Sequence, residues 1–287
     1  MIDYNPKVWF TFIFRIHKAD TVRKLAPMFL ALSVYSALIA FLELELLELS
    51  PNSDLKQITV VHSLLGFVIS MLLVFRTNTA YDRWWEGRKQ WGSLVNNSRN
   101  LAIKLNAILP ASNTASREFF RIMIPNYAFG LKNHLRAVYN TEELEGDPKI
   151  QPDKHVPNQI SSLILAHIHE LYRQQQISGE QLLSLNPELQ SFTDICGACE
   201  RIRNTPIPFS YSVFIKKFIF FFVMTLPIGY VFSLHYLIIP VVVFIFYVLA
   251  SLELIAEEIE DPFGFDANDL PTDTISANIR KHVAEIL

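Results

Sequence analysis

Residues 58–92 read ITVVHSLLGFVISMLLVFRTNTAYDRWWEGRKQWG, and this stretch decides what kind of protein the chain forms. From residue 58 to residue 75 the side chains are apolar, apart from a few small polar residues and His62. A run of about 20 such residues crosses the hydrocarbon core of a bilayer. Charged residues begin at Arg76 and then recur. We therefore expect a membrane-spanning helix whose end at Arg76 lies on the cytosolic side.

Two further regions of the sequence are as apolar as this one. Residues 26–42 are long enough for one span, whereas residues 218–252 contain no Asp, Glu, Lys or Arg and are too long for a single crossing. We expect the longer region to fold back near residues 233–236 and to form two helices. The sequence thus predicts an all-α integral membrane protein with four membrane-spanning helices in two hairpins.

Positive charge is concentrated on one side of the predicted spans. The connector at residues 50–57 has only Lys56, whereas the basic residues on the other side are Lys18, Arg23, Lys24, Arg76, Arg83, Arg88, Lys89, Lys216 and Lys217. Because positively charged flanks stay in the cytosol, we expect both termini to be cytosolic and the protein to lie in the inner membrane of a cell. The N-terminus has no basic start followed by an apolar core, so we expect no removable signal peptide.

The expected organisation has five parts. They are a cytosolic N-terminal segment (1–24), a first hairpin (25–75), a large cytosolic helical region (76–213), a second hairpin (214–257), and a cytosolic acidic segment and tail (258–287). Within the helical region, apolar residues recur at helical spacing in residues 81–108, 117–135, 158–175 and 181–202. Three prolines between residues 142 and 158 favour a mobile excursion there.

Composition excludes several classes of function. With 51% hydrophobic residues and a mean hydropathy of +0.24, the chain is too apolar for a typical soluble enzyme. A net charge of -3 gives no basic face for nucleic acid. We expect His134 and His155 to be surface or structural residues that stand alone, and Cys196 and Cys199 to be small packing residues rather than a redox pair or half of a zinc site. No enzyme activity is expected.

Five residues of the second span occur at every fourth position, and they are Thr59, Ser63, Phe67, Met71 and Phe75. On a helix they form one slowly turning stripe that passes from small polar to large apolar side chains. In an isolated helix such a stripe is a packing face. In a ring of identical helices it would line a pore that narrows to a hydrophobic constriction, where water and ions are held poorly.

Ionisable residues near the membrane are costly unless they face water or a partner. Glu43, Glu45 and Glu48 crowd the outward end of the first span, where we expect a water-lined outer vestibule. Solvation at the interface, or pairing with His62, is the alternative. His62 lies off the stripe by its angle on the helix, so we expect it to pack against a neighbouring helix.

Three motifs resemble the bestrophin family in its bacterial form. They are residues 75–92, FRTNTAYDRWWEGRKQWG, residues 197–211, GACERIRNTPIPFSY, and residues 260–271, EDPFGFDANDLP. The motifs occur in the family's order and bracket the predicted spans, and the match covers nearly the whole chain. The resemblance implies a homopentameric ion channel, assembled as a ring around a central pore that the second span lines.

The resemblance also implies roles for particular residues. Phe67, Met71 and Phe75 correspond to the neck of the family's pore, which is the stripe already described. A second constriction lies at the cytosolic exit of the family's pore, and Gln181 is the candidate for it in this chain.

Animal members of the family bind calcium around the third motif and the acidic run that follows it. This chain keeps acids there at Asp261, Asp266 and Asp269, but Phe265 stands where an acid is usual. A hard cation takes about six or more oxygen ligands, and this loop offers few from side chains. We therefore expect no required cofactor, with calcium as the one candidate.

These observations favour a passive channel for small monovalent ions. We expect a preference for cations, because a ring of subunits would multiply the charge of Glu43, Glu45 and Glu48 at the outer entrance. The alternatives are an anion (chloride) channel, favoured by the positive ring edges of Phe67 and Phe75, a secondary transporter, or a membrane scaffold. The expected partners are further copies of the chain, membrane lipid and the permeant ions, but not nucleic acid.

Overall fold

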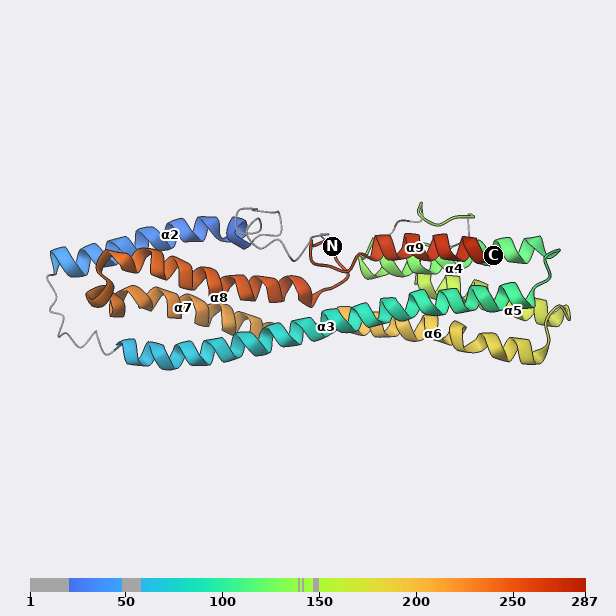
Figure 1. Cartoon of the computed structure of the whole chain (residues 1–287), viewed down its shortest axis with the longest axis horizontal. Helices are drawn as coiled ribbons and strands as arrows, with labels where there is room; N and C mark the ends of the chain where they lie inside the picture. The colour runs from blue at the N-terminus through green and yellow to red at the C-terminus, as the bar shows by residue number, and fades with distance from the viewer. Residues whose placement is uncertain (1–20, 48–57, 139, 141, 147–149) are drawn as a thin grey trace.

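The computed structural model describes residues 21–47, 58–138, 140, 142–146 and 150–287, and it is helical without strands throughout these ranges. Its elements are α2 (Thr21–Phe41), the π-helical turn η1 (Leu42–Leu46), α3 (Ile58–Ile108), α4 (Thr114–Leu135), α5 (Val156–Arg173), α6 (Gly179–Asn204), α7 (Phe209–Leu234), the 3-10 turn η3 (His235–Leu237), α8 (Ile238–Glu260) and α9 (Thr272–Ile286). The molecule is elongated, with the helices running along its length (Figure 1). The expected all-α fold is confirmed.

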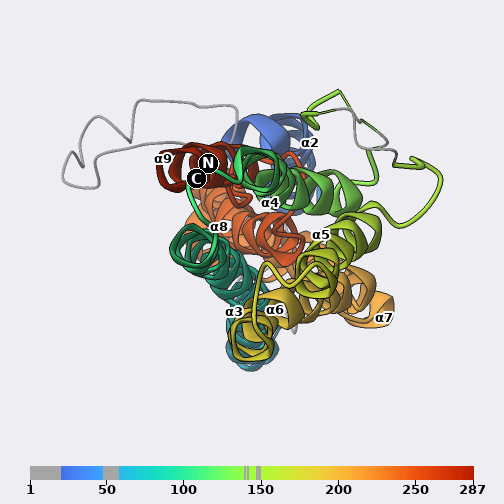
Figure 2. The same cartoon turned by 90° about the vertical axis from the view of Figure 1, so that its right-hand side faces the viewer.

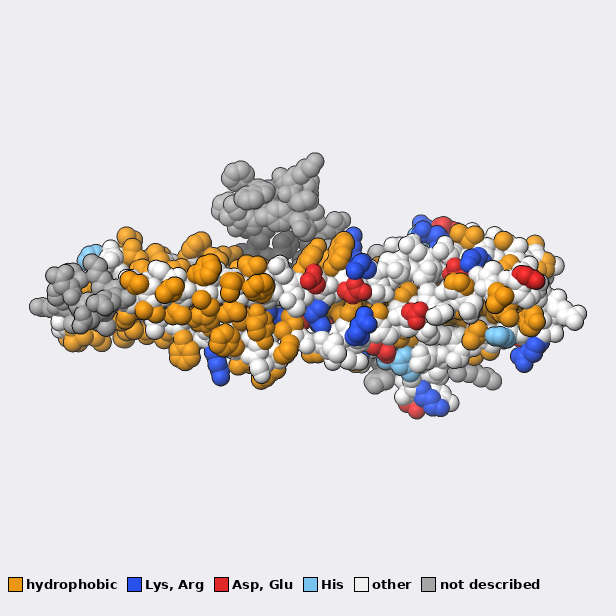
Figure 3. All heavy atoms as spheres, turned by 90° about the horizontal axis from the view of Figure 1, so that it is seen from below, with side chains coloured by type: hydrophobic (Ala, Val, Ile, Leu, Met, Phe, Trp, Pro, Cys, Tyr) orange, Lys and Arg blue, Asp and Glu red, His pale blue; other side chains and the backbone are white. Residues whose placement is uncertain are grey.

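One half of the molecule is apolar on its surface. It contains α2, α7, α8 and the first part of α3 (Figure 1), and hydrophobic side chains cover the face of it that Figure 3 shows. Among the described residues, Thr21–Leu46, Ile58–Ile108 and Phe209–Glu260 are long and apolar enough to cross a membrane. The last of these turns back at η3, so that α7 and α8 pack together as the expected hairpin. That all four helices span a bilayer stays a prediction.

The other half, which we call the polar half, is a helical bundle with a mixed surface (Figure 3). It consists of α4, α5, α6, α9 and the rest of α3, and Figure 2 shows these helices end-on. The helices that the periodicity predicts in this region are confirmed. Phe120, Tyr127 and Phe192 are among its largest buried side chains. Cys196 and Cys199 are free thiols buried in the same core, in agreement with a packing role.

Helix α3 connects the two halves without a break. The expected boundary between residues 75 and 76 falls inside this helix, which has 51 residues and is therefore about 75 Å long at 1.5 Å per residue. Ile69 and Leu73 lie in the core of the apolar half, whereas Trp91 and Leu94 lie in the core of the polar half. One rigid element thus belongs to both cores.

A buried cationic side chain, that of Arg76, lies on α3 between the two cores. It is 1% exposed, its Nη2 lies 2.7 Å from Oε2 of Glu260, and its Nε lies 3.4 Å from Oε2 of Glu253. Two turns further on, Arg83 donates to the carbonyl oxygen of Glu260 at 3.0 Å and to that of Ile202 at 2.5 Å. These two arginines hold the ends of α8 and α6 against α3.

The C-terminal region departs from the sequence-based expectation. The expected tail is the helix α9, which packs along α4 and α3 through the buried Ile279 and Val283. Described residues of the excursion before α5 contact the polar half, and the mobility expected of this segment stays a prediction. Lys132 of α4, which is 3% exposed, lies 2.7 Å from Glu143 of this excursion and 2.9 Å from Asp273 of α9.

Replacing Arg76 with Met should strongly destabilise the protein. The substitution leaves Glu253 and Glu260 without their cation, and breaking a buried pair in this way costs about 3–5 kcal/mol. The temperature at which the detergent-solubilised protein loses its native size-exclusion peak measures the effect.

Lys89→Met is the matched control, because Lys89 is exposed and pairs with Glu86 at 2.6 Å on the surface of the same helix. Exposed pairs contribute about 0–1 kcal/mol. Equal losses of stability in the two variants would show that burial of the Arg76 pair is not what matters.

Candidate ion pore

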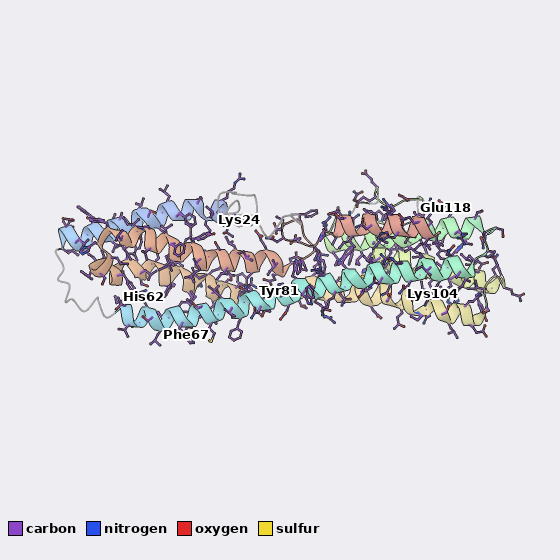
Figure 4. All side chains as sticks on the ribbon, in the orientation of Figure 1. Lys24, His62, Phe67, Tyr81, Lys104 and Glu118 are labelled. Carbon is purple, nitrogen blue, oxygen red and sulfur yellow. The ribbon has the colours of Figure 1, made fainter. Side chains whose placement is uncertain are left out.

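The three expected neck residues all face away from the subunit's own helices. Phe67 is 70% exposed, Met71 44% and Phe75 56%. Figure 4 shows Phe67 on the outer side of α3, away from α7 and α8. Ile69 and Leu73, on the opposite face, are each 1% exposed and make the contacts within the subunit. The apolar stripe is therefore not needed to pack this subunit.

The outer part of the stripe is polar and turns toward α7. Ser63 is exposed, and its hydroxyl donates to the carbonyl oxygen of Thr59 at 3.0 Å. Thr59 itself is half-buried and lies beside Gly229 of α7. A Cβ added to Gly229 would lie 3.7 Å from the methyl group of Thr59. Within the stripe, the exposed positions thus begin at Ser63, one turn later than the sequence pattern suggests.

His62 is a packing residue, as expected. It is 4% exposed, and its Nε2 lies 2.9 Å from Oγ1 of Thr225 on α7, while its Nδ1 lies 3.1 Å from the carbonyl oxygen of Ile58. Figure 4 shows His62 on the side of α3 opposite to Phe67. The imidazole therefore joins α3 to α7 and leaves the open face apolar.

The acids expected in an outer vestibule do not lie on one surface. Glu43 lies within η1 and is 5% exposed, whereas Glu45 is exposed and accepts a hydrogen bond from the hydroxyl of Tyr236 at 3.3 Å. Glu48 lies outside the described residues. Of the two carboxylates that the structure describes, that of Glu45 is therefore accessible to an outer entrance and that of Glu43 is buried.

Gln181, the candidate for the cytosolic constriction, caps its own helix. Its side-chain oxygen accepts from the backbone N–H of Ser178 at 2.8 Å, and its backbone N–H donates to the Ser178 hydroxyl at 3.2 Å. In this reciprocal capping box, the side-chain amide of Gln181 is hydrogen-bonded to the backbone at the start of α6. Leu183, two residues later, is 73% exposed and is the large apolar side chain on the surface of this turn.

The loop after α8 does not gather its three aspartates into one site. Among the described residues, the carboxylate oxygens of Asp261, Asp266 and Asp269 do not all lie within 4.8 Å of one another. Oδ2 of Asp269 accepts from the backbone N–H of Asp266 at 2.6 Å, and Asp269 is 3% exposed. A calcium ion takes six to eight oxygens at about 2.3–2.6 Å, so these three side chains would supply only part of its ligands. Calcium binding stays an expectation from the sequence alone.

Comparison with known proteins identifies the family. Residues 1–285 match the model of the bacterial and fungal bestrophin proteins. The chain belongs to the bestrophin family. A solved structure of a bacterial bestrophin homologue from Klebsiella pneumoniae superimposes on this bestrophin with a TM-score of 0.82 at 28% sequence identity, over 92% of this chain and 98% of that one.

Curated relatives are similar over about three quarters of their length. A protein of Synechocystis is 35% identical over 77% of this chain and 75% of its own, and YneE of Escherichia coli is 36% identical over 74% and 71%. Both are named voltage-dependent anion channel-forming proteins. The preference for cations expected from the sequence is not supported by these relatives, which fit its anion alternative better.

Asp269 should make the stability of the protein depend on pH. Burial raises the pKa of its carboxyl to about 7, and the carboxylates of Asp266 and Asp261 add to the rise. Because the folded pKa lies above the unfolded value of about 3.9, the folded state binds the proton more tightly between these values. Stability therefore falls as the pH rises from about 4 to 7.

Replacing Asp269 with Asn removes this titration and keeps an acceptor for the Asp266 N–H. Between pH 5 and pH 8 the Tm of the parent should fall by several degrees more than the Tm of the variant. This follows because a change of 1 kcal/mol in the free energy of unfolding shifts Tm by about 2–4 °C. Thermal unfolding at four pH values measures the difference. Asp153→Asn, at an exposed position, is the control. Parallel curves for the parent and Asp269→Asn would contradict the prediction.

Proposed function

We propose that this bestrophin is an anion-conducting channel in which several copies of α3 surround one central pore. The observation that carries the proposal is the exposed apolar face made by Phe67, Met71 and Phe75 on a helix whose other face is fully packed. The channel names of the relatives support it, and they indicate a channel rather than an enzyme.

A single subunit cannot enclose a pore with one helix, so the proposal requires a ring. We take the number of subunits as five, the number that the family resemblance implies. The exposed face of α3 is wider than the stripe, because Val60, Leu64 and Val74 are also exposed. In a ring, the middle of this face would point to the axis and its flanks would contact the neighbouring copies.

The neck would act as a hydrophobic gate. From Phe67 to Phe75 the helix rises about 12 Å at 1.5 Å per residue. Five copies of three large apolar side chains over this length would lose water readily and block ions until the ring widens. A change in the spacing of the α3 helices is therefore the motion that would open the pore.

The placement of the acids supports anions over cations. The argument for cations needs three carboxylates per subunit at the outer entrance, but Glu43 is buried and the hydroxyl of Tyr236 donates to Glu45. Within the neck no charge acts, and the positive edges of the Phe67 and Phe75 rings favour an anion. We also propose an orientation. The channel lies in the inner membrane of the cell, with both termini and the polar half in the cytosol.

The proposal is tested by reconstitution of the purified protein into bilayers free of other proteins. Light scattering corrected for detergent should first give five subunits. Under a gradient of KCl, the reversal potential should lie near the equilibrium potential of chloride. A value near that of potassium would mean a cation channel. Flux that requires a second solute would mean a secondary transporter, and absence of current in every condition would leave a scaffold.

Replacing Phe67, Met71 and Phe75 together with Ala should increase the current. The substitutions remove bulk from the neck without adding charge, so a wider and more easily wetted pore should give a gain of about 10-fold or more in open probability, if about 1.4 kcal/mol of the dewetting barrier is lost. Single-channel recording in the same bilayers measures it.

Leu73→Ala is the control for this variant. Leu73 is an apolar residue of the same helix but is 1% exposed and packed inside the subunit. It should lower stability by about 2–5 kcal/mol without raising the current. If the triple variant conducts like the parent, the stripe is a packing face and the pore lies elsewhere.

A further inference from the structure

Three potential metal ligands that are distant in the sequence meet in the polar half. They are His134 in the last turn of α4, His155 at the start of α5 and Glu200 in α6. Nε2 of each imidazole lies 2.7 Å from the same carboxylate oxygen, Oε1 of Glu200. The sequence-based expectation that the two histidines stand alone is wrong, because residues 21 positions apart (155 − 134) are brought side by side by the fold, with their ring planes tilted by 47°.

The positions of these three side chains are fixed by their surroundings. The carbonyl oxygen of His134 accepts from Nη1 of Arg203 at 2.8 Å, one turn after Glu200 on the same helix. His155 caps α5, with its Nδ1 accepting from the backbone N–H of Asn158 at 3.2 Å. The two imidazole rings lie 4.3 Å apart, and all three side chains are half-buried. Both rings therefore direct Nε2 to one point.

We propose that His134, His155 and Glu200 bind one divalent transition-metal ion of the zinc class. Two imidazole nitrogens and one carboxylate oxygen are a common ligand set for zinc. Their ligand atoms all lie within 4.8 Å of one another. Among the described residues, no other group of three or more His, Cys, Asp or Glu side chains meets this criterion. The site does not depend on the proposed channel function.

The geometry requires only a small adjustment. Zinc binds nitrogen and oxygen at about 2.0–2.2 Å, so ligands in a tetrahedral site lie about 3.3 Å from one another. The two N···O distances of 2.7 Å must therefore each open by about 0.6 Å. The carboxylate is on a long side chain, and its withdrawal from the two rings makes room for the metal between the carboxylate oxygen and the two Nε2 atoms.

A cavity lies beside one of the three ligands, His134. It has a volume of about 150 Å³ and is lined by His134, Asn140, Lys154 and Arg203, among others. Such a volume holds several water molecules. Lys154 and Arg203 are the cationic side chains of this cavity, and their charge favours an anion within it.

The protonation states suit a metal. Burial lowers the pKa of His134, which favours its neutral imidazole. Burial opposes ionisation of Glu200, but the hydrogen bonds from His155 and His134 hold the pKa of its carboxyl below its usual value. A neutral imidazole and an ionised carboxylate are the forms that ligate.

Binding has a further structural consequence at His155. With Nδ1 accepting from Asn158, a neutral His155 carries its proton on Nε2. A metal on Nε2 moves that proton to Nδ1, and the Asn158 N–H then loses its acceptor. Zinc should therefore increase hydrogen exchange at the first turn of α5, although it links α4, α5 and α6 and raises the Tm of the protein as a whole.

The test uses the full chain in detergent, with any affinity tag removed and bound metal stripped by a chelator. Zinc should bind at one ion per chain, as measured by competition with a chromogenic chelator. Because loss of even an outer partner of a metal ligand costs about 10–100-fold in affinity, Glu200→Gln and His155→Ala should each weaken binding by about 100-fold or more. His169→Ala removes an exposed histidine of α5 and should bind zinc like the parent.

Cobalt(II) distinguishes this site from the cysteines, because only a thiolate ligand gives a sulfur-to-metal charge-transfer band. Burial raises the pKa of the Cys196 thiol to about 12, and we expect no such band. The proposal is overturned if the parent takes up no metal at about 10 µM, a threshold that corresponds to about 7 kcal/mol of binding free energy. Unchanged affinity in Glu200→Gln, or a thiolate band, would overturn it equally.

Discussion

The buried guanidinium of Arg76 is the constraint on which the rest of the structure depends. An isolated charge at this depth would be very costly, and it is retained because Glu253 and Glu260 of α8 face it. These ion pairs fix the axial position of α8 relative to α3, because neither helix can slide along the other without leaving a buried charge unpaired. Glu260 also accepts from the backbone N–H of Ile207 at 2.6 Å, so the segment that leads into α7 is fixed to the same point.

This junction lets one helix serve two environments. On one side of it, α3 packs through Ile69 and Leu73 and leaves its apolar stripe open. On the other side, it packs through Trp91 and Leu94 into a bundle with a polar surface. Close contact at the junction needs a residue without a side chain, because a Cβ on Gly87 would lie 3.1 Å from Phe263 and Pro262. The loop after α8 can therefore lie directly on α3, where Arg83 holds the end of α6 as well.

Local pattern predicted the helices, but the sequence could not show what depends on distant contacts. Apolar spacing predicted the bundle helices, and the length of the charge-free stretch predicted the turn near His235, because both are local properties of the sequence. The C-terminal helix α9 has a weaker pattern: Ile275, Ile279 and Val283 have helical spacing, but polar, charged and small residues separate them. The meeting of His134, His155 and Glu200 has no local signal, because their approach is made by the packing of α4, α5 and α6.

Glu43 and Glu45 show why the number of charges in a sequence is a poor guide to ion selectivity. Glu43 and Glu45 are two residues apart, so on any helix they point in nearly opposite directions and cannot share a surface. The π-helical turn η1, closed by the Leu47 N–H on the Leu42 carbonyl at 2.9 Å, turns the chain further within these residues. An inward carboxylate such as that of Glu43 is removed from water and contributes little field at the mouth of a pore. In the proposed pore, fewer acids per subunit than the sequence contains would act on the permeant ion, and the apolar stripe of α3 would have correspondingly more influence.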